Sequence, residues 1–284
     1  MNSQRRSLWT EALTHTALLV AVAFALYPVL WVASLAVSPS GTPSVHPLPL
    51  PDGVSLANFR AVALHHDALG RWLFLRQLGN SLAVSAATAT ASVAIATPAA
   101  YALARFEFVG AQGSIRALLA TQMFPGVATA VPLYVILDAL RLLDTRAGLI
   151  LVYATTTLPF AIFQLRGAFE AIPRDLEEAA MVDGATRWQA FVRVVLPAAR
   201  PAIAVTTLFG FMSAWNEFIL AATFLSREED FTLPVALQRY VGEYDAAWGS
   251  FAAGAVLVSL PVMAMFYAVQ RHLVGGLTAG GVKG

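Results

Sequence analysis

Histidine and cysteine most often supply nucleophiles and metal ligands, and this chain offers little of either. No cysteine occurs among its 284 residues, which excludes thiolate nucleophiles, thiolate metal sites and disulfides. The five histidines lie in loops or near the ends of apolar stretches, at positions 15, 46, 65, 66 and 272. An intramembrane serine protease needs a histidine inside such a stretch, and a zinc protease needs a His-Glu-x-x-His motif. Neither pattern is present, so we predict no catalytic residue and no metal site.

Lys283 is the only lysine, and it decides where ATP could be hydrolysed. A Walker A loop has a Gly-x-x-x-x-Gly frame directly before its lysine and Ser or Thr after it, whereas Val282 precedes Lys283 and Gly284 follows it. If ATP drives this protein, another chain must hold the ATP and magnesium, and no cofactor is expected in this one. The formal net charge of +1 provides no field that would attract nucleic acid.

Glu217 is an acid inside a long apolar stretch that runs from about residue 202 to residue 225. It lies about 16 residues, or roughly 24 Å of helix, beyond the start of that stretch. An ionisable group at this depth often faces a cavity, which would make Glu217 a pathway-lining residue and Asn216 an inter-helix hydrogen-bonding group. A carboxylate near the outer lipid headgroups, beside the interfacial Trp215, is an equally good interpretation. The sequence leaves both open.

A second group of acids lies in the loop 226–249, interleaved with aromatic residues. The group comprises Glu228, Glu229, Asp230, Phe231, Tyr240, Glu243, Tyr244, Asp245 and Trp248. Aromatic rings beside carboxylates could contact a sugar or a partner protein. A solvated loop with interfacial aromatics is the commoner interpretation.

The segment 173–200 is too polar to cross a membrane and reads as two short helices. Its first turn carries the acids Asp175, Glu177 and Glu178. Acids there complement the positive end of a helix dipole. Gly184, after Asp183, predicts the end of the first helix because glycine accepts left-handed geometry. Thr186 and Gln189 have capping-box spacing and predict the start of the second helix.

This segment also carries apolar residues that need a partner surface. They are Ala179, Ala180, Trp188, Phe191 and Val195. Periodicity alone is equally consistent with a helix lying on lipid headgroups and a helix docking into a partner protein.

The elements that position these residues are apolar helices. The chain is 58% hydrophobic and 12% charged, against about 25% charged for soluble domains, which indicates a membrane protein. We predict six membrane-spanning helices, at about 17–37, 78–104, 117–137, 147–165, 202–225 and 251–269. The first is longer than the h-region of about 7–15 residues in a signal peptide, so we favour a retained helix over a cleaved leader. Prolines inside the spans are compatible with kinks around a cavity or with ordinary packing.

Basic residues predict the orientation of these helices. The expected regions are an N-terminus at 1–16, an outer loop at 38–77, a permeation core at 78–272 containing the loop 166–200, and a tail at 273–284. With six spans, Lys and Arg number 2, 2, 5 and 2 in the segments on the side of the termini, against 3, 2 and 2 on the other side. The positive-inside rule therefore places both termini and the loop 166–200 in the cytoplasm.

The loop 166–200 resembles the cytoplasmic loop motif of ABC-importer permeases. That motif reads Glu-Ala-Ala, three residues, Gly, nine residues, Ile, one residue, Leu-Pro. The matching residues are Glu178, Ala179, Ala180, Gly184, Leu196 and Pro197, with Val194 in place of the isoleucine. From about residue 70 onward the chain further resembles the smaller permease subunits of bacterial maltose/maltodextrin importers. The landmarks of that resemblance are residues 122–125, 176–180, 183–186, 188–191, 215–218, 270–271 and 276–284.

The resemblance implies an all-α integral membrane protein of six transmembrane helices, with the type I ABC importer permease fold and a cytoplasmic coupling-helix loop. It implies four kinds of partner in a bacterial cytoplasmic membrane: a second, larger permease subunit, an ATPase homodimer, an extracytoplasmic sugar-binding protein and membrane lipid. In the maltose importers the sugar is held mainly by the larger permease, so no sugar-binding residue is predicted here.

The resemblance also implies roles for three groups of residues. The ATPase-docking residues would be Glu178, Ala179, Ala180, Asp183, Gly184, Leu196 and Pro197. The residues that contact the binding protein would be Glu228, Glu229, Asp230 and Phe231. The tail residues at the ATPase interface would be Thr278, Ala279, Gly280, Gly281, Val282, Lys283 and Gly284.

We therefore expect a permease subunit, not an enzyme, in an ATP-driven importer of maltose and maltodextrins. The same machinery could carry trehalose or another oligosaccharide. A secondary transporter is the alternative of a different class, and it would require inverted repeats and midplane ion ligands that the sequence does not show.

Overall fold

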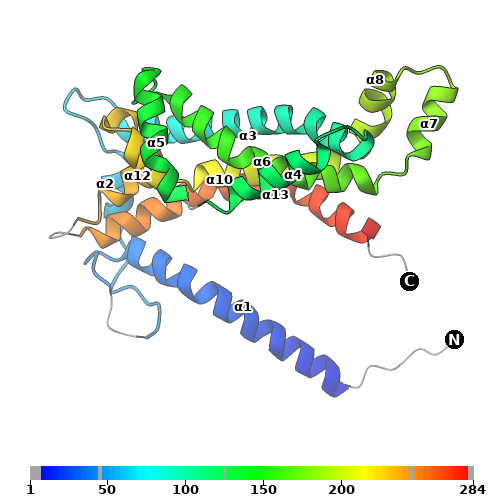
Figure 1. Ribbon diagram of the computed structural model, residues 1–284. Helices are drawn as coiled ribbons and strands as arrows, with labels where there is room; N and C mark the ends of the chain where they lie inside the picture. The colour runs from blue at the N-terminus through cyan, green and yellow to red at the C-terminus, as the bar shows by residue number, and fades with distance from the viewer. Residues whose placement is uncertain (1–7, 44–46, 125, 243–245, 281–284) are drawn as a thin grey trace. The chain divides into compact units, whose positions relative to one another are not determined.

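The computed structural model describes residues 8–43, 47–124, 126–242 and 246–280, with side chains between 10 and 270 in those ranges. The described residues form helices and loops (Figure 1), as predicted, with two isolated β-bridges and no strand among them. In chain order the elements are α1 (Leu8–Val37), α2 (Ala57–Ala63), α3 (Leu73–Arg105), α4 (Ala111–Gln122), α5 (Gly126–Ala139), α6 (Arg146–Ala171), α7 (Asp175–Val182), α8 (Arg187–Ala190), the π-helical turn η1 (Phe191–Val195), α9 (Leu196–Ala198), α10 (Arg200–Trp215), α11 (Ile219–Phe224), the 3-10 turn η2 (Glu228–Asp230), α12 (Leu233–Gln238) and α13 (Trp248–Gly280).

The chain forms two compact units. The first consists of Met1–Phe74 and Leu237–Ser259, and the second of Leu75–Ala236 and Leu260–Gly284. The second unit contains the loop 166–200 and the segment 228–231, so both groups of candidate residues outside the tail belong to one body.

In the first unit, small residues allow α1 and the beginning of α13 to pack closely. Ala36, Ala252 and Ala253 form a buried cluster. The side-chain amide of Asn58, in α2, donates to the carbonyl oxygens of Ala36 and Ser38 at 3.1 and 3.0 Å. The most apolar window of α1 has no buried residue, which suits a helix surrounded by lipid.

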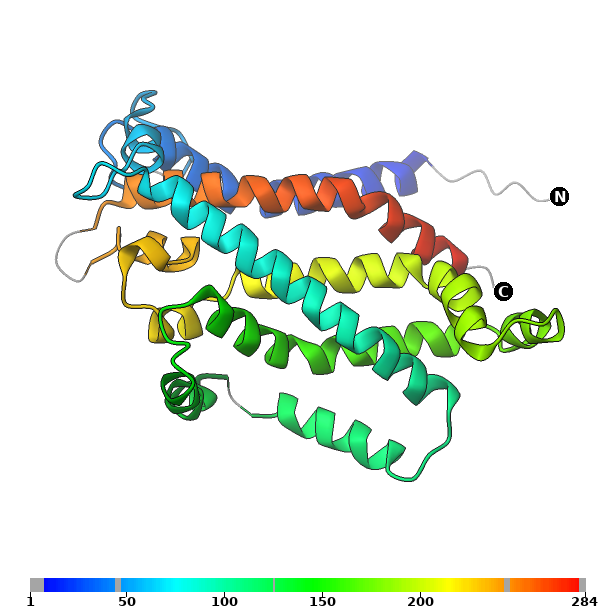
Figure 2. The same cartoon turned by 90° about the horizontal axis from the view of Figure 1, so that it is seen from above.

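The second unit has two apolar clusters. In Figure 2, α3 (cyan) crosses α6 (green) and α10 (yellow). One cluster joins α3 and α6 to α5, α10 and α11, and its largest buried side chains include Tyr153 and Phe224. The other joins the end of α3 to α6, η1 and α9, and it contains Phe169 and Phe191. Between the clusters, the Ser92 and Thr157 hydroxyls hydrogen-bond at 2.7 Å and link α3 to α6.

The helices that could cross a membrane broadly match the predicted spans. Four described helices are long and apolar enough, namely α1, α3, α6 and α13, and two bent helix pairs raise the number to six. Three of the four extend beyond the spans predicted at 78–104, 147–165 and 251–269. The first helix also begins earlier than the predicted residue 17, at Leu8.

The prediction of one continuous span at 117–137 is wrong. The structure has two helices there, α4 and α5, whose axes differ by 100°. Pro125, which lies outside the described residues, falls between them. The residue before a proline is disfavoured in helical geometry, and proline itself cannot donate the amide hydrogen bond of a helix. A helix therefore ends readily at this position.

The prediction of one continuous span at 202–225 is also wrong. Helix α10 ends at Trp215 and α11 begins at Ile219. The carboxylate of Glu217 accepts the backbone N–H groups of Leu220 and Ala221 at 2.8 and 3.0 Å, so it caps the new helix.

Asp144 fastens the loop before α6 to the residues after α11. Its carboxylate accepts the Ser226 backbone N–H at 2.6 Å and the Ser226 hydroxyl at 2.7 Å. Burial opposes ionisation of this carboxyl group, but the hydrogen bonds from Ser226 and the charge of Arg227 outweigh it and hold the pKa of Asp144 below its usual value.

Replacement of Asp144 by asparagine is expected to weaken the acid sensitivity of the protein. Because the folded pKa lies below the ordinary value of 3.8, the ionised group stabilises the fold above that value, and the contribution is lost as the pH falls through the folded pKa. Thermal unfolding in detergent should show the wild type losing stability more steeply than Asp144→Asn in this acid range. Near neutral pH the variant should be less stable by about 1 kcal/mol, because an amide offers only one acceptor atom. Asp138→Asn, at an exposed position, is the control, and equal pH profiles for all three proteins would contradict the prediction.

Candidate functional site

The candidate site is the loop 166–200, called the coupling loop below. Figure 1 shows α7 and α8 beyond one end of the long helices α3 and α6. Helix α7 ends at Val182, and the predicted break follows at Gly184, whose φ is +92°. The Gly184 N–H donates to the Met181 carbonyl at 3.1 Å, and the Ala185 N–H donates to the Ala180 carbonyl at 3.0 Å. These two bonds define a Schellman motif, which reverses the chain after α7.

The start of α8 is the predicted capping box. The Gln189 N–H donates to the Thr186 hydroxyl at 3.3 Å, and the Thr186 N–H donates to the Gln189 side-chain oxygen at 2.8 Å. This pair fixes the direction of the chain directly after the reversal.

Thr186→Ala should loosen α8 without disturbing the rest of the chain. The substitution removes the acceptor of one amide and should cost about 1 kcal/mol of local helix stability. Hydrogen exchange followed by mass spectrometry should show faster exchange in the peptide that contains Gln189. Thr186→Ser keeps the hydroxyl and should exchange like the wild type; faster exchange in both variants would argue against the capping role.

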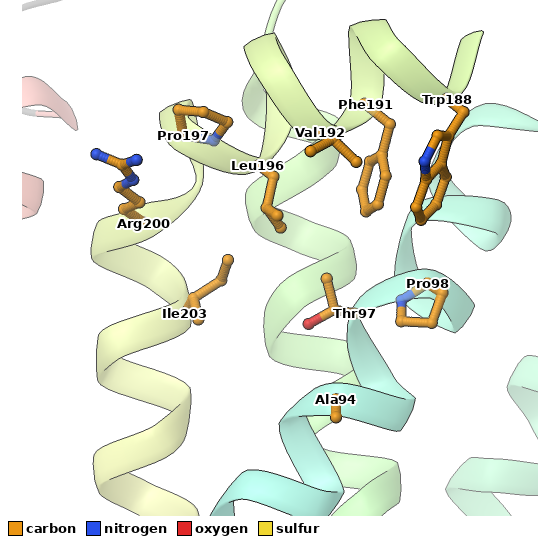
Figure 3. Close-up of a pocket in the computed structure, with 10 residues that line it drawn as sticks. All are labelled: Ala94, Thr97, Pro98, Trp188, Phe191, Val192, Leu196, Pro197, Arg200 and Ile203. Atoms are coloured by element: carbon orange, nitrogen blue, oxygen red, sulfur yellow. The ribbon is translucent and has the colours of Figure 1, made fainter.

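A cavity of about 520 Å³ lies between α3, the segment Trp188–Pro197 and the start of α10. Figure 3 shows Phe191, Val192 and Leu196 from the coupling loop on one side, and Thr97 and Pro98 of α3 on the other. The lining is apolar except for Thr97 and Arg200. This space leaves part of the apolar surface of the coupling loop uncovered by the chain itself.

The apolar residues of the coupling loop divide into two groups. Phe191 and Val195 are only 4% and 0% exposed, because they pack in the cluster with α3 and α6. The expectation that these two need an external partner is therefore wrong. Trp188 and Val182 are 68% and 87% exposed, so they are the most exposed large apolar side chains of the loop and remain available to a partner.

The predicted docking residues lie on or next to this surface. Glu178, Ala179, Asp183 and Gly184 are exposed, whereas Ala180, Leu196 and Pro197 are half-buried. Leu196 and Pro197 line the cavity. The first five surround the reversal after α7, and the last two precede α10.

Glu177 holds α7 against α3, a role that the sequence did not single out. Helix α7 turns Glu177 inward, where it forms an ion pair with Arg105 and accepts a hydrogen bond from the Tyr101 hydroxyl at 2.9 Å. Its neighbour Glu178 points to the exposed side. Adjacent residues of a helix face directions about 100° apart, so the doublet Glu177-Glu178 indicated that one of the two acids would face the protein.

The segment 228–231, called the acidic segment below, is attached to the beginning of α3. Arg76 forms ion pairs with Glu229 and Asp230 at 3.5 and 3.9 Å. Glu228 is exposed, and Phe231 is only 5% exposed. Phe231 therefore anchors the segment in the apolar core, and its contact with a binding protein stays a prediction.

Asn216 bonds within its own helix, although one interpretation of the sequence made it an inter-helix hydrogen-bonding group, and it is Glu217 that bonds between helices. The Glu217 carboxylate accepts a hydrogen bond from the Tyr153 hydroxyl, on α6, at 2.6 Å. The Asn216 side-chain amide donates to the Met212 carbonyl of its own helix at 2.9 Å. Glu217 thus connects α6 to α11, whereas Asn216 is exposed and bonds only locally among the contacts described.

The tail predicted at 273–284 does not begin as a separate segment, because α13 extends into it. The backbone of α13 continues through Thr278 and Ala279 to Gly280. Gly281, Val282, Lys283 and Gly284 lie outside the described residues.

Comparison with known proteins gives a family match and full-length relatives. A family model described as binding-protein-dependent transport system inner membrane component matches residues 92–278. The chain is 38% identical to the trehalose transport system permease protein SugB of Mycobacterium tuberculosis, over 100% of both chains. It is 37% identical to the maltose/maltodextrin transport system permease protein MalG of Salmonella typhimurium, over 96% of this chain and 95% of MalG.

A solved structure is also similar. One chain in the crystal structure of a bacterial ABC transporter involved in the import of the acidic polysaccharide alginate superposes with a TM-score of 0.76 and 26% identity. The match covers 95% of this chain and 99% of that chain.

Proposed function

Because the chain belongs to the family of binding-protein-dependent transport system inner membrane components, we propose that it is the permease subunit of an ATP-driven sugar importer in a bacterial cytoplasmic membrane. The two relatives described above, which match nearly the whole length of the chain, are named as sugar permeases. The fold is the all-α, type I ABC importer permease fold, with six transmembrane segments of which some are bent or broken.

The observation that carries the proposal is the exposed surface of the coupling loop. Trp188 and Val182 project from a rigidly capped reversal, beside Glu178 and Gly184 of the loop motif. A partner that covers this surface would bury two large apolar side chains, which favours association. We assign this partner as an ATPase homodimer that supplies ATP, magnesium and the force for transport.

The other partners follow from the same proposal. A second, larger permease subunit completes the membrane pathway, and an extracytoplasmic binding protein delivers sugar to the acidic segment. Both termini of this chain face the cytoplasm, as the distribution of basic residues favours. ATP-driven closure of the ATPase moves the permeases from inward-facing to outward-facing, and hydrolysis resets them.

For the substrate we propose a glucose oligosaccharide with α linkages, either maltose with maltodextrins or trehalose. The identities to SugB and MalG are 38% and 37%, so the relatives support the two sugars equally. No residue of this chain is assigned to sugar binding.

Reconstitution tests the proposal. The chain should be co-expressed with the ATPase, second permease and binding protein of its importer, and placed in vesicles that contain ATP. Uptake of labelled maltose or trehalose should require both ATP and the ATPase. Uptake that persists without the ATPase and follows an ion gradient would instead identify a secondary transporter. Competition between the two unlabelled sugars would identify the substrate.

A further inference from the structure

Helix α3 contacts both of the segments to which the proposed function assigns a partner. Its last turns contact Glu177 in the coupling loop. Its first turns contact the acidic segment. The two sets of contacts are separated by about 28 residues of one helix, which is roughly 42 Å.

The inner contact is a buried ion pair. Arg105 and Glu177 have side chains only 6% and 10% exposed, and both carboxylate oxygens are engaged, one by Arg105 and one by Tyr101. The Arg105 guanidinium also donates to the Ile172 carbonyl, at the end of α6, at 2.9 Å. One side chain thus ties α3 to α6 and α7 together.

Aromatic rings pack around Tyr101 on one side of this ion pair, and a cavity of about 170 Å³ adjoins the pair on another. The Tyr101 ring lies 4.3 Å from the Phe191 ring and 5.9 Å from the rings of Phe169 and Phe106. The pair is unlike Arg166–Glu170 and Arg227–Asp230, in each of which one partner is at least 47% exposed. A mostly buried pair with two further hydrogen bonds holds its geometry better than an exposed one.

In the outer contact, side-chain amides of α3 donate hydrogen bonds to backbone carbonyls of the acidic segment. Gln77 donates to the Glu228 carbonyl at 3.0 Å. Asn80, which is fully buried, donates to the Glu229 and Phe231 carbonyls at 2.9 and 3.1 Å. These amides of α3 therefore hold the backbone of the acidic segment, in addition to the ion pairs of Arg76 with Glu229 and Asp230.

The covalent route between the same two segments is not one continuous helix. The chain from the coupling loop to the acidic segment bends by 72° where α10 begins. It is interrupted again between α10 and α11, from Asn216 to Phe218. Helix α3 continues without a break over its 33 residues, although Pro98 lies inside it.

We propose that α3 moves as one helix and so transmits movement between the coupling loop and the acidic segment. Arg105 with Glu177 at one end of α3, and Asn80 at the other, are the positioning residues. The inference rests on the proposed function, because it assumes that an ATPase moves the coupling loop. When the loop moves, the buried ion pair moves the end of α3 with it. The acidic segment follows through Gln77 and Asn80, so its position reports the state of the ATPase.

The absence of cysteine allows a direct test in the assembled complex. Glu228→Cys places one thiol of this chain on the exposed acidic segment, and thiols of the other subunits are blocked before assembly. The rate of labelling by a maleimide probe is measured with ATP and with ADP, in the absence of binding protein. ATP should change this rate by about fivefold in the otherwise native chain.

When Glu177→Gln is added to the Glu228→Cys chain, the ratio of the labelling rates with ATP and with ADP should approach one. ATPase co-purification and ATP hydrolysis should persist. Glu170→Gln, the same substitution at an exposed ion pair of α6, should leave the response intact. Asn80→Ala should abolish the response from the other end. A variant that only loses packing should show lower assembly and lower hydrolysis together. A variant that only uncouples the two segments should lose the labelling response and keep both.

A full response in the assembled Glu177→Gln complex overturns the proposal. If that variant does not assemble, the labelling response is measured in Tyr101→Phe, which removes one hydroxyl and keeps the ring. A native response in Tyr101→Phe also overturns the proposal. A native background that shows no response to ATP and no ATP-dependent uptake would instead refute the proposed function.

Discussion

Gly184→Val is expected to reduce ATP-dependent sugar uptake by about tenfold or more, through loss of the chain reversal that presents α8 to the ATPase. At φ +92° a residue with a side chain is strained, by about 1–2 kcal/mol for an ordinary residue and more for a β-branched one. A strain of this size lowers the fraction of loops in the docking conformation by roughly the factor expected for uptake.

The strain at Gly184 comes from the backbone and not from crowding. A Cβ atom built at this position meets no atom within 4 Å in the chain. Asparagine is the residue other than glycine that best tolerates left-handed geometry, so Gly184→Asn should retain most of the uptake. The two variants have side chains of similar size and differ mainly in their tolerance of this geometry.

The measurement is vesicle uptake, with co-purification of the ATPase as a second readout. Gly184→Val should lose both in parallel, whereas Gly184→Asn should keep both. Gly113→Val provides a control, because this glycine lies in α4 with ordinary helical geometry and open space around its Cβ position. Equal loss with valine and asparagine would show that the ATPase packs against Gly184 itself, which would contradict the backbone explanation.

The local structure of the coupling loop could be predicted because short-range signals determine it. Gly184 ends one helix, and Thr186 with Gln189 begins the next, by interactions among residues at most five positions apart. Such signals act without help from the rest of the fold. The same is true of the long apolar helices, whose composition alone requires a lipid or apolar environment.

The interruptions of the spans could not be predicted in the same way. Hydropathy is insensitive to a turn within an apolar stretch, so 117–137 and 202–225 both read as single helices. In the second case the break depends on Glu217, which finds its hydroxyl partner, Tyr153, 64 residues earlier in the chain. Long-range pairing of this kind is invisible to periodicity.

The sequence also could not predict which individual side chains on short helices are buried. Phe191 and Trp188 are both aromatic and lie three residues apart, yet one is buried and the other exposed. Which of them faces the protein depends on the positions of α3 and α6. The inward orientation of Glu177 has the same origin, because its partners Tyr101 and Arg105 belong to α3.

Glu217→Ala should destabilise the fold more than Asp144→Asn or Thr186→Ala. The variant leaves the Tyr153 hydroxyl, on a side chain only 1% exposed, without its acceptor, and it removes the acceptor of the Leu220 and Ala221 amides. Each unsatisfied buried group costs about 1–3 kcal/mol, so a total loss of about 3 kcal/mol or more is expected. Thermal unfolding of the purified chain in detergent should show a clear decrease in Tm.

Asn216→Ala is the matched control, because Asn216 is adjacent, exposed and bonded within its own helix. It should change stability by no more than about 0.5 kcal/mol. In a double-mutant cycle, Tyr153→Phe should cost much less in the Glu217→Ala background than in the wild type, because the hydroxyl has already lost its acceptor. Additive effects would refute the direct coupling of α6 to α11.

Glu217→Gln separates this structural role from transport. The amide keeps the shape of the side chain and one acceptor oxygen, so the variant should be intermediate in stability and should assemble. If Glu217 acts only as a helix cap, uptake per assembled complex should equal that of the wild type. A stable, assembled Glu217→Gln complex that no longer transports sugar would instead place the carboxylate on the translocation pathway, as one interpretation of the sequence allows.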